Sequence, residues 1–139
     1  RISTDTAKFG APEIKLGWIG GGGMSALLAE AIGSSNTAMM IMTGEPIDAT
    51  KALNWGLVSE IVAPTDLLNR AREIAEQIAA NAPIAAESAK SNIRAAFSMA
   101  REDAIAYERD LQVICLATED AHEGRAAFKE KRKAIFKKR

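Results

Sequence analysis

With 139 residues, 47% of them apolar, the chain is long enough to form one domain with a hydrophobic core. Eighteen basic and 18 acidic residues give a formal net charge of zero, and the apolar stretches are short and interrupted, which excludes a transmembrane helix. The one cysteine, Cys115, permits no internal disulfide and is expected to pack within a helix. A single cysteine without a disulfide is typical of proteins in a reducing compartment, so we expect a cytoplasmic location, or the mitochondrial matrix in a eukaryote.

The chain opens with an extended segment that leads to a constrained acid. Residues 1–10 mix β-branched and polar types and predict a short strand, or a strand pair with a turn near Asp5. Pro12 fixes its own φ and restricts the residue before it, so Glu13 is expected on a rigid loop. Four glycines, Gly20–Gly23, then precede a helical pattern directly, and a helix start presents free backbone N–H groups.

An acid close to free N–H groups suits chemistry on a polarised carbonyl or on a water that must be held. The glycine run is equally typical of a tight strand-to-helix connection, because it lacks the residues of a P-loop and the third glycine of a dinucleotide fingerprint. Glu13 is equally compatible with a surface glutamate that follows a proline. On these residues alone, both alternatives stay open.

Helical periodicity dominates the chain after the glycine run. Apolar residues recur with helical period over 22–32, Gly33 ends that helix, and 36–42 predicts a second short helix. A turn over 43–46 follows. The remaining predicted elements are a short helix capped by Asp48 and closed by Gly56, a strand over 57–62, helices over 66–79, 84–100 and 102–117, and a fourth long helix capped by Thr118.

The end of the chain is strongly basic. From Arg125 to Arg139 there are eight basic residues and one acid, Glu130. Such a segment can meet the phosphates of a nucleotide, of coenzyme A or of a nucleic acid, or it can be a solvated helix end whose cations complement the helix dipole. The segment carries no recognised nucleic-acid-binding motif, so we expect no nucleic-acid partner. His122 is the only histidine, and we expect no metal site.

Five blocks of sequence together resemble the crotonase (enoyl-CoA hydratase/isomerase) superfamily. They occur in the family's order and spacing, and they are residues 7–17, 42–49, 52–58, 61–62 and 118–133. The resemblance implies a helix-rich α/β fold, in which residues 1–81 end the family's spiral core and residues 82–139 form a helical oligomerisation region. It also implies a homo-oligomer, a trimer or hexamer. The surface between subunits would be the apolar face of Leu111, Ile114, Cys115 and Leu116, and the alternative is an ordinary helix contact within one chain.

Family members are considerably longer than this chain, and the match begins midway through them. We therefore expect the chain to be the C-terminal half of such a protein. The other half would carry the CoA-adenine loop, both oxyanion-hole N–H groups and the first catalytic glutamate. The resemblance thus predicts that these 139 residues are inactive alone, while the parent protein is an enoyl-CoA hydratase or isomerase of fatty-acid metabolism.

The resemblance implies an acyl-CoA substrate that reacts through a thioester enolate, with coenzyme A as part of the substrate and no separate cofactor. Glu13 lies where the family's hydratases hold their second catalytic glutamate, which protonates the α-carbon and helps to hold the water. Gly21 falls where a backbone N–H contacts that water. The resemblance also implies that Trp18 lines an acyl or aromatic pocket. The alternative is a non-catalytic crotonase-like fragment or assembly module.

Lys131 matches a C-terminal lysine that reaches a CoA phosphate in a neighbouring subunit of family trimers, a role that Arg132 or Lys133 could also take. The chain departs from the family pattern in two places. Gly20 stands where a proline is common, and Gln112 stands where some members place an aromatic ring near the adenine. These departures leave the acyl specificity open.

Overall fold

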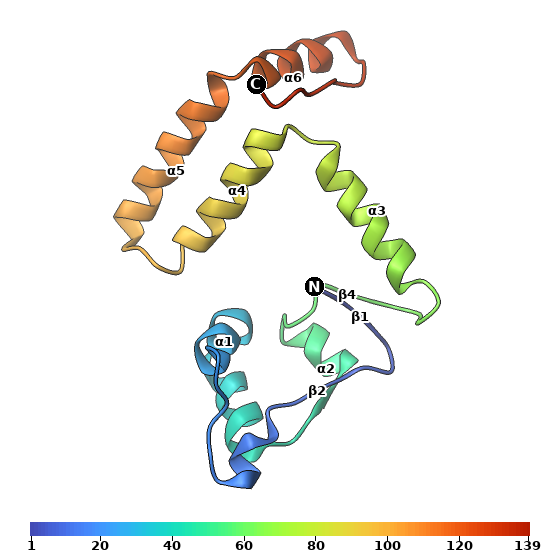
Figure 1. The fold of residues 1–139 in the computed structure, drawn as a ribbon, viewed down its shortest axis with the longest axis vertical. Helices are drawn as coiled ribbons and strands as arrows, with labels where there is room; N and C mark the ends of the chain where they lie inside the picture. The colour runs from blue at the N-terminus through green and yellow to red at the C-terminus, as the bar shows by residue number, and fades with distance from the viewer. The chain divides into compact units, whose positions relative to one another are not determined.

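A computed structural model describes all 139 residues, and the chain divides into two units, Arg1–Arg72 and Glu73–Arg139 (Figure 1). Helices predominate, with only short strands, and all of the strands precede residue 64. The predicted helix-rich α/β fold is therefore confirmed. None of the helices combines the length and apolar content that crossing a bilayer requires. The roles predicted for residues 1–81 and 82–139 stay predictions.

The first unit contains two separate pairs of strands. β1 (Ile2–Thr4) runs parallel to β4 (Glu60–Val62), and β2 (Lys8–Phe9) runs antiparallel to β3 (Ile47–Asp48). The first ten residues thus form two strands, but the possibility that they pair with each other was wrong. A parallel partner must return through a long crossover, and a pattern confined to ten residues cannot reveal it.

The predicted strand over 57–62 is only half its expected length. Leu57 and Val58 are buried, but they form a turn after the short helix and contribute to the core there. Their amides both donate to the carbonyl of Ala52 instead of to a neighbouring strand. The error arose because buried apolar residues in a turn have the same composition as a buried strand.

α1 (Met24–Thr43) contains the predicted break at Gly33, whose φ of 77° and ψ of 160° interrupt the helical path. α2 (Ala49–Asn54) begins at Asp48, whose side chain accepts the Lys51 N–H at 2.7 Å, so this predicted cap is confirmed. The two helices and the adjoining loops enclose one core, made of Ala11, Ile32, Met40, Ile47, Ala52, Leu57 and Val58.

α3 (Leu67–Ala79) matches the predicted amphipathic helix, yet none of its residues is buried. Leu68 and Ile78 on its apolar stripe are exposed. The helix start is tied to β4 by Arg70, which donates to both oxygens of Glu60 at 2.8 and 3.1 Å. These bonds from Arg70 lower the pKa of Glu60 below its usual value. The stripe therefore contributes little to the packing seen in this chain.

The second unit is helical throughout. α4 (Pro83–Ala95) and α5 (Arg101–Leu116) lie side by side, and α6 (Glu119–Glu130) follows (Figure 1). The helix predicted to reach residue 100 ends at Ala95, because the next residues form the turn between α4 and α5. Thr118 accepts the Ala121 N–H at 3.1 Å, which confirms the predicted cap of α6.

Candidate active site

The loop that carries Glu13 is a 3₁₀ helix, η1 (Pro12–Leu16), which the sequence pattern did not predict. Ala11, only 2% exposed, anchors its start in the core, and Pro12 occupies its first turn. Gly17 ends it in the left-handed region at φ 93°. The Trp18 N–H then donates to the Glu13 carbonyl at 3.3 Å. The main chain of Glu13 is thus held from both sides.

The C-terminal end of α1 braces this turn. Gly44, with φ 64°, caps α1, and a Cβ there would lie 3.0 Å from side-chain atoms of both Ile14 and Lys15. Lys15 also pairs with Glu45 at 2.7 Å, an exposed contact of small energetic value. The close approach at Gly44 is therefore the stronger reason why η1, and Glu13 with it, keeps its position against α1.

The carboxylate of Glu13 is partly buried, and its Oε2 is buried without a hydrogen bond within the chain. Most buried polar side-chain atoms have a partner, because leaving one unpaired costs free energy. An unpaired acceptor on a braced turn is able to accept a hydrogen bond from a bound water or to carry a proton. This is the chemistry predicted for Glu13 from the sequence.

The glycine run adopts conformations that need glycine. Gly22 and Gly23 have φ values of 67° and 88°, and Gly23 is the N-cap of α1. Gly21 is exposed, and its N–H makes no hydrogen bond in the chain, while its carbonyl accepts the Met24 N–H at 3.3 Å. The amide predicted to contact a water is thus available as a donor.

Gly20 has a local reason to lack a side chain. A Cβ at this position would lie 2.4 Å from the thioether of Met24, in the first turn of α1. A proline there, as is common in the family, would force the Met24 side chain to move. The departure from the family pattern at Gly20 is therefore coupled to the packing of Met24.

Glu13, Trp18 and Gly21 come from one continuous segment of the first unit. Trp18 is 57% exposed, and its neighbours Leu16 and Ile19 are exposed as well. The loop that follows the acid therefore presents an apolar surface. A cavity of about 520 Å³ lies elsewhere, between α4 and α5, and no predicted site residue lines it.

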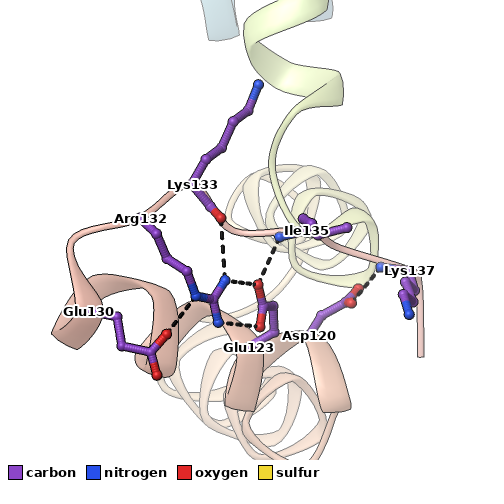
Figure 2. A network of polar contacts seen from close by, with 7 residues as sticks. All are labelled: Asp120, Glu123, Glu130, Arg132, Lys133, Ile135 and Lys137. Atoms are coloured by element: carbon purple, nitrogen blue, oxygen red, sulfur yellow. Dashed lines mark hydrogen bonds and ion pairs between the residues drawn. The ribbon is translucent and has the colours of Figure 1, made fainter.

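Lys131 lies in the second unit, where α6 ends. It is exposed, adopts a left-handed conformation with φ 53°, and forms no ion pair. The neighbouring Arg132 is engaged: its guanidinium donates to Glu123 at 2.6 and 3.0 Å and to Glu130 at 2.6 Å (Figure 2). Arg132 is thus a poor substitute for Lys131 as a phosphate ligand, and only Lys133 remains as an alternative.

The sequence pattern did not predict this network, which holds the segment of residues 131–139, hereafter the tail. Asp120 is 2% exposed and accepts the N–H groups of Lys137 and Lys138 at 2.6 and 2.8 Å. Glu123 accepts the Ile135 N–H at 2.9 Å. The available signal was two acids three residues apart on α6, followed by a basic segment able to fold back on them.

The bonds to Glu123 predict how the tail responds to acid. Hydrogen bonds from Arg132 and from the Ile135 N–H lower the pKa of Glu123 to about 2 from 4.5. Because this pKa is depressed in the folded state, the carboxylate stabilises the tail fully above pH 4.5, and the contribution is lost as the pH falls toward 2. A carbon-13 NMR titration of the Glu123 carboxyl should show a midpoint near 2.

The control for this titration is Glu123→Gln. In this variant the amide of Ile135 should exchange with solvent faster than in the unchanged protein at neutral pH, because its acceptor is weakened. A Glu123 midpoint at the ordinary value of 4.5 would show that the Arg132 bonds are absent in solution.

The family model described as enoyl-CoA hydratase/isomerase matches residues 1–139. A Mycobacterium tuberculosis protein named "Probable enoyl-CoA hydratase echA8" is 45% identical over 135 residues, which are 97% of this chain and 52% of that protein. The Escherichia coli 2,3-dehydroadipyl-CoA hydratase is 39% identical over 139 residues, 99% of this chain and 54% of that one.

The same relation holds for solved structures. The crystal structure of enoyl-CoA hydratase from Bacillus anthracis superimposes on this chain with a TM-score of 0.97 at 35% identity. The superposition covers 100% of this chain and 54% of the Bacillus anthracis chain. The chain spans about half the length of the curated relatives it matches.

Proposed function

Because this chain belongs to the enoyl-CoA hydratase/isomerase family, we propose that the protein containing it adds water reversibly to trans-2-enoyl-CoA thioesters. The observation that carries the proposal is the unpaired Oε2 of Glu13, held on the braced turn η1. A hydratase needs an acid of this kind, because the enolate formed by addition of water must be protonated.

In the proposed reaction, the oxygen of a water bonds to the β-carbon as the C=C electrons move toward the thioester carbonyl. Glu13 holds that water and delivers its own proton to the α-carbon, and the Gly21 N–H donates to the water oxygen. The proton that the water loses passes to the first glutamate, which the resemblance places in family sequence that these residues do not match. The thioester oxygen gains negative charge, and donors aimed at it are usually the largest catalytic contribution. The resemblance assigns those donors to family sequence that these residues do not match.

Two further residues would hold the substrate. Trp18 would contact the acyl group, and Lys131 would contact a phosphate of the CoA moiety, so no separate cofactor is required. The exposed loop of Trp18 and the unpaired ammonium of Lys131 support these roles. We also propose a cytoplasmic location, or the mitochondrial matrix in a eukaryote, on the grounds of the single free cysteine, Cys115.

The test is an assay of the native protein with crotonyl-CoA. Formation of 3-hydroxybutyryl-CoA, measured by mass, is expected. A 3-enoyl-CoA offered in parallel distinguishes isomerisation, since its conversion to the 2-enoyl isomer without gain of water would identify an isomerase. If neither substrate changes, the non-catalytic alternative gains support.

We further propose that the protein self-associates as a trimer or hexamer. On α5, Ile114 and Leu116 of the predicted face are exposed, as are Ile105 and Val113, while Leu111 and Cys115 are partly buried. A run of exposed apolar side chains on one helix is typical of an interface. Sedimentation equilibrium of the native protein should give a mass three or six times that of one chain, and a monomer at all concentrations would contradict this.

A further inference from the structure

The turn at Lys131 needs support from outside its own residues. A left-handed φ of 53° is rare for a residue with a side chain. Two main-chain bonds close the turn, from the Lys131 N–H to Phe128 at 3.3 Å and from the Arg132 N–H to Ala127 at 3.0 Å. Main-chain bonds of this kind frequently end a helix, but here no glycine lowers the cost of the conformation.

Glu123 supplies the missing support. Both of its oxygens accept from the Arg132 guanidinium, and Oε1 also accepts the Ile135 N–H (Figure 2). One carboxylate on α6 thereby binds the residue immediately after Lys131 and also Ile135, four residues after Lys131. The bidentate pair fixes orientation as well as distance, because the guanidinium fork matches the two carboxylate oxygens. We call this arrangement the Glu123 clamp.

The clamp also determines which cations of the tail are paired with acids. Arg132 is turned toward the acids of α6, and Figure 2 shows the Lys133 side chain extending away from them. Lys131 and Lys133 are exposed and form no ion pair. The clamp thus pairs one cation, Arg132, with the acids of α6 and leaves the ammonium of Lys131 unpaired on a fixed turn, which lowers the entropy cost of binding an anion there.

We propose that Glu123 is a positioning residue for coenzyme A: by holding Arg132 and Ile135 it fixes the turn that presents Lys131 to a phosphate of the CoA moiety. The inference rests on the proposed function, specifically on the contact between Lys131 and phosphate. Glu123 itself is an anion and makes no favourable contact with a phosphate. A residue of this charge would be expected to weaken CoA binding, whereas the positioning role makes it strengthen CoA binding.

The direction in which CoA affinity changes when Glu123 is replaced therefore distinguishes positioning from simple electrostatics. If Glu123 acted only through its charge, replacing it with glutamine would strengthen binding of CoA, since a nearby negative charge would be lost and Arg132 would be released. If Glu123 positions Lys131, the same replacement weakens binding, because the turn loses its fixed conformation.

The experiment is calorimetric titration of the native full-length protein with CoA and with 3′-dephospho-CoA. Lys131→Ala and Glu123→Gln are each expected to weaken CoA binding roughly tenfold, the cost of about one charge-assisted hydrogen bond. The double variant should be no weaker than either single one. A loss that vanishes with 3′-dephospho-CoA assigns the contact to the 3′-phosphate, and a loss that persists assigns it to the pyrophosphate.

Glu119→Gln is the matched control. It removes the same charge from the same helix and breaks an exposed pair with Arg139, at 2.8 Å, that does not hold the turn at Lys131. We expect its CoA affinity to be unchanged. In turnover assays Glu123→Gln should raise KM and leave kcat unaltered. If it folds poorly, Glu123→Asp, which keeps the charge but shortens the reach, should weaken binding in the same direction.

Two results would overturn the inference. Unchanged or tighter binding in Glu123→Gln, with weaker binding in Lys131→Ala, would leave Lys131 as a ligand and remove the positioning role. Unchanged CoA binding in Lys131→Ala would show that Lys131 does not contact a CoA phosphate, and Glu123 would then have no positioning role in CoA binding. Neither result bears on hydration through Glu13, which the crotonyl-CoA assay measures separately.

Discussion

Glu13→Gln is expected to lower the hydration rate of the full-length protein by about 10²–10⁴-fold, the usual contribution of general acid–base catalysis. Glutamine has the same shape and still accepts a hydrogen bond, but it cannot deliver a proton to the α-carbon. The fold should persist, because the Glu13 carboxylate makes no ion pair and Oε2 makes no hydrogen bond within the chain. The loss should therefore appear in kcat, with an unchanged melting temperature.

The matched control is Glu30→Gln. Glu30 is an exposed carboxylate on α1, in the same unit as Glu13. Its removal should leave turnover at the level of the unchanged protein. Equal turnover in Glu13→Gln and Glu30→Gln would show that the family resemblance assigned the acid to the wrong residue.

The parts of the fold that sequence predicted best are those governed by local chemistry. Asp48 and Thr118 cap their helices as expected, because a cap depends on a side chain and an amide three residues apart. The break at Gly33 was predicted for the same reason, since glycine tolerates the left-handed region that ends a helical path. Such features are decided within a few residues.

Contacts between distant segments were not predicted. The pairing of β1 with β4 joins residues almost sixty positions apart, and nothing within either strand specifies its partner. The Glu123 clamp similarly depends on the tail folding back over α6, so Arg132 meets an acid nine positions earlier and not at helical spacing. Spacing rules within one helix could not identify it.

The candidate site divides in the same way. The assignment of Glu13, Trp18 and Gly21 as site residues rests on the family resemblance, and their functional roles stay proposals. Free amides at the start of α1 were expected from the glycine run. The 3₁₀ turn and the brace at Gly44 came from the structure alone. These are backbone properties, and one-dimensional patterns of side-chain type carry little information about them.

A polypeptide of only these 139 residues is expected to show no measurable hydration of crotonyl-CoA and at most weak binding of CoA. It contains the proposed acid, Glu13, and the amide of Gly21, but the paired N–H donors for the thioester oxygen are implied in sequence it does not match. Losing one such donor typically costs about 10²–10³-fold in rate, so the loss of both would place turnover below detection.

The structure gives a second, independent reason for that expectation. β1 and β4 form a parallel sheet of only two strands, whereas parallel sheets are usually larger and covered on both faces. Ile19, Leu27 and Met42 are exposed in the same unit, and an exposed apolar surface favours association. The isolated polypeptide should therefore aggregate at concentrations where the native protein does not.

The decisive assay uses the purified 139-residue polypeptide, verified by mass to be free of longer protein, beside the native protein at equal active-site concentration. Its soluble fraction is measured first, so that inactivity is not confused with aggregation. Inactivity of soluble polypeptide would locate the oxyanion donors elsewhere. Turnover within tenfold of the native protein would instead require the donors to lie among these residues, and the free amides of the glycine run, Gly20–Gly23, would then be the first positions to test.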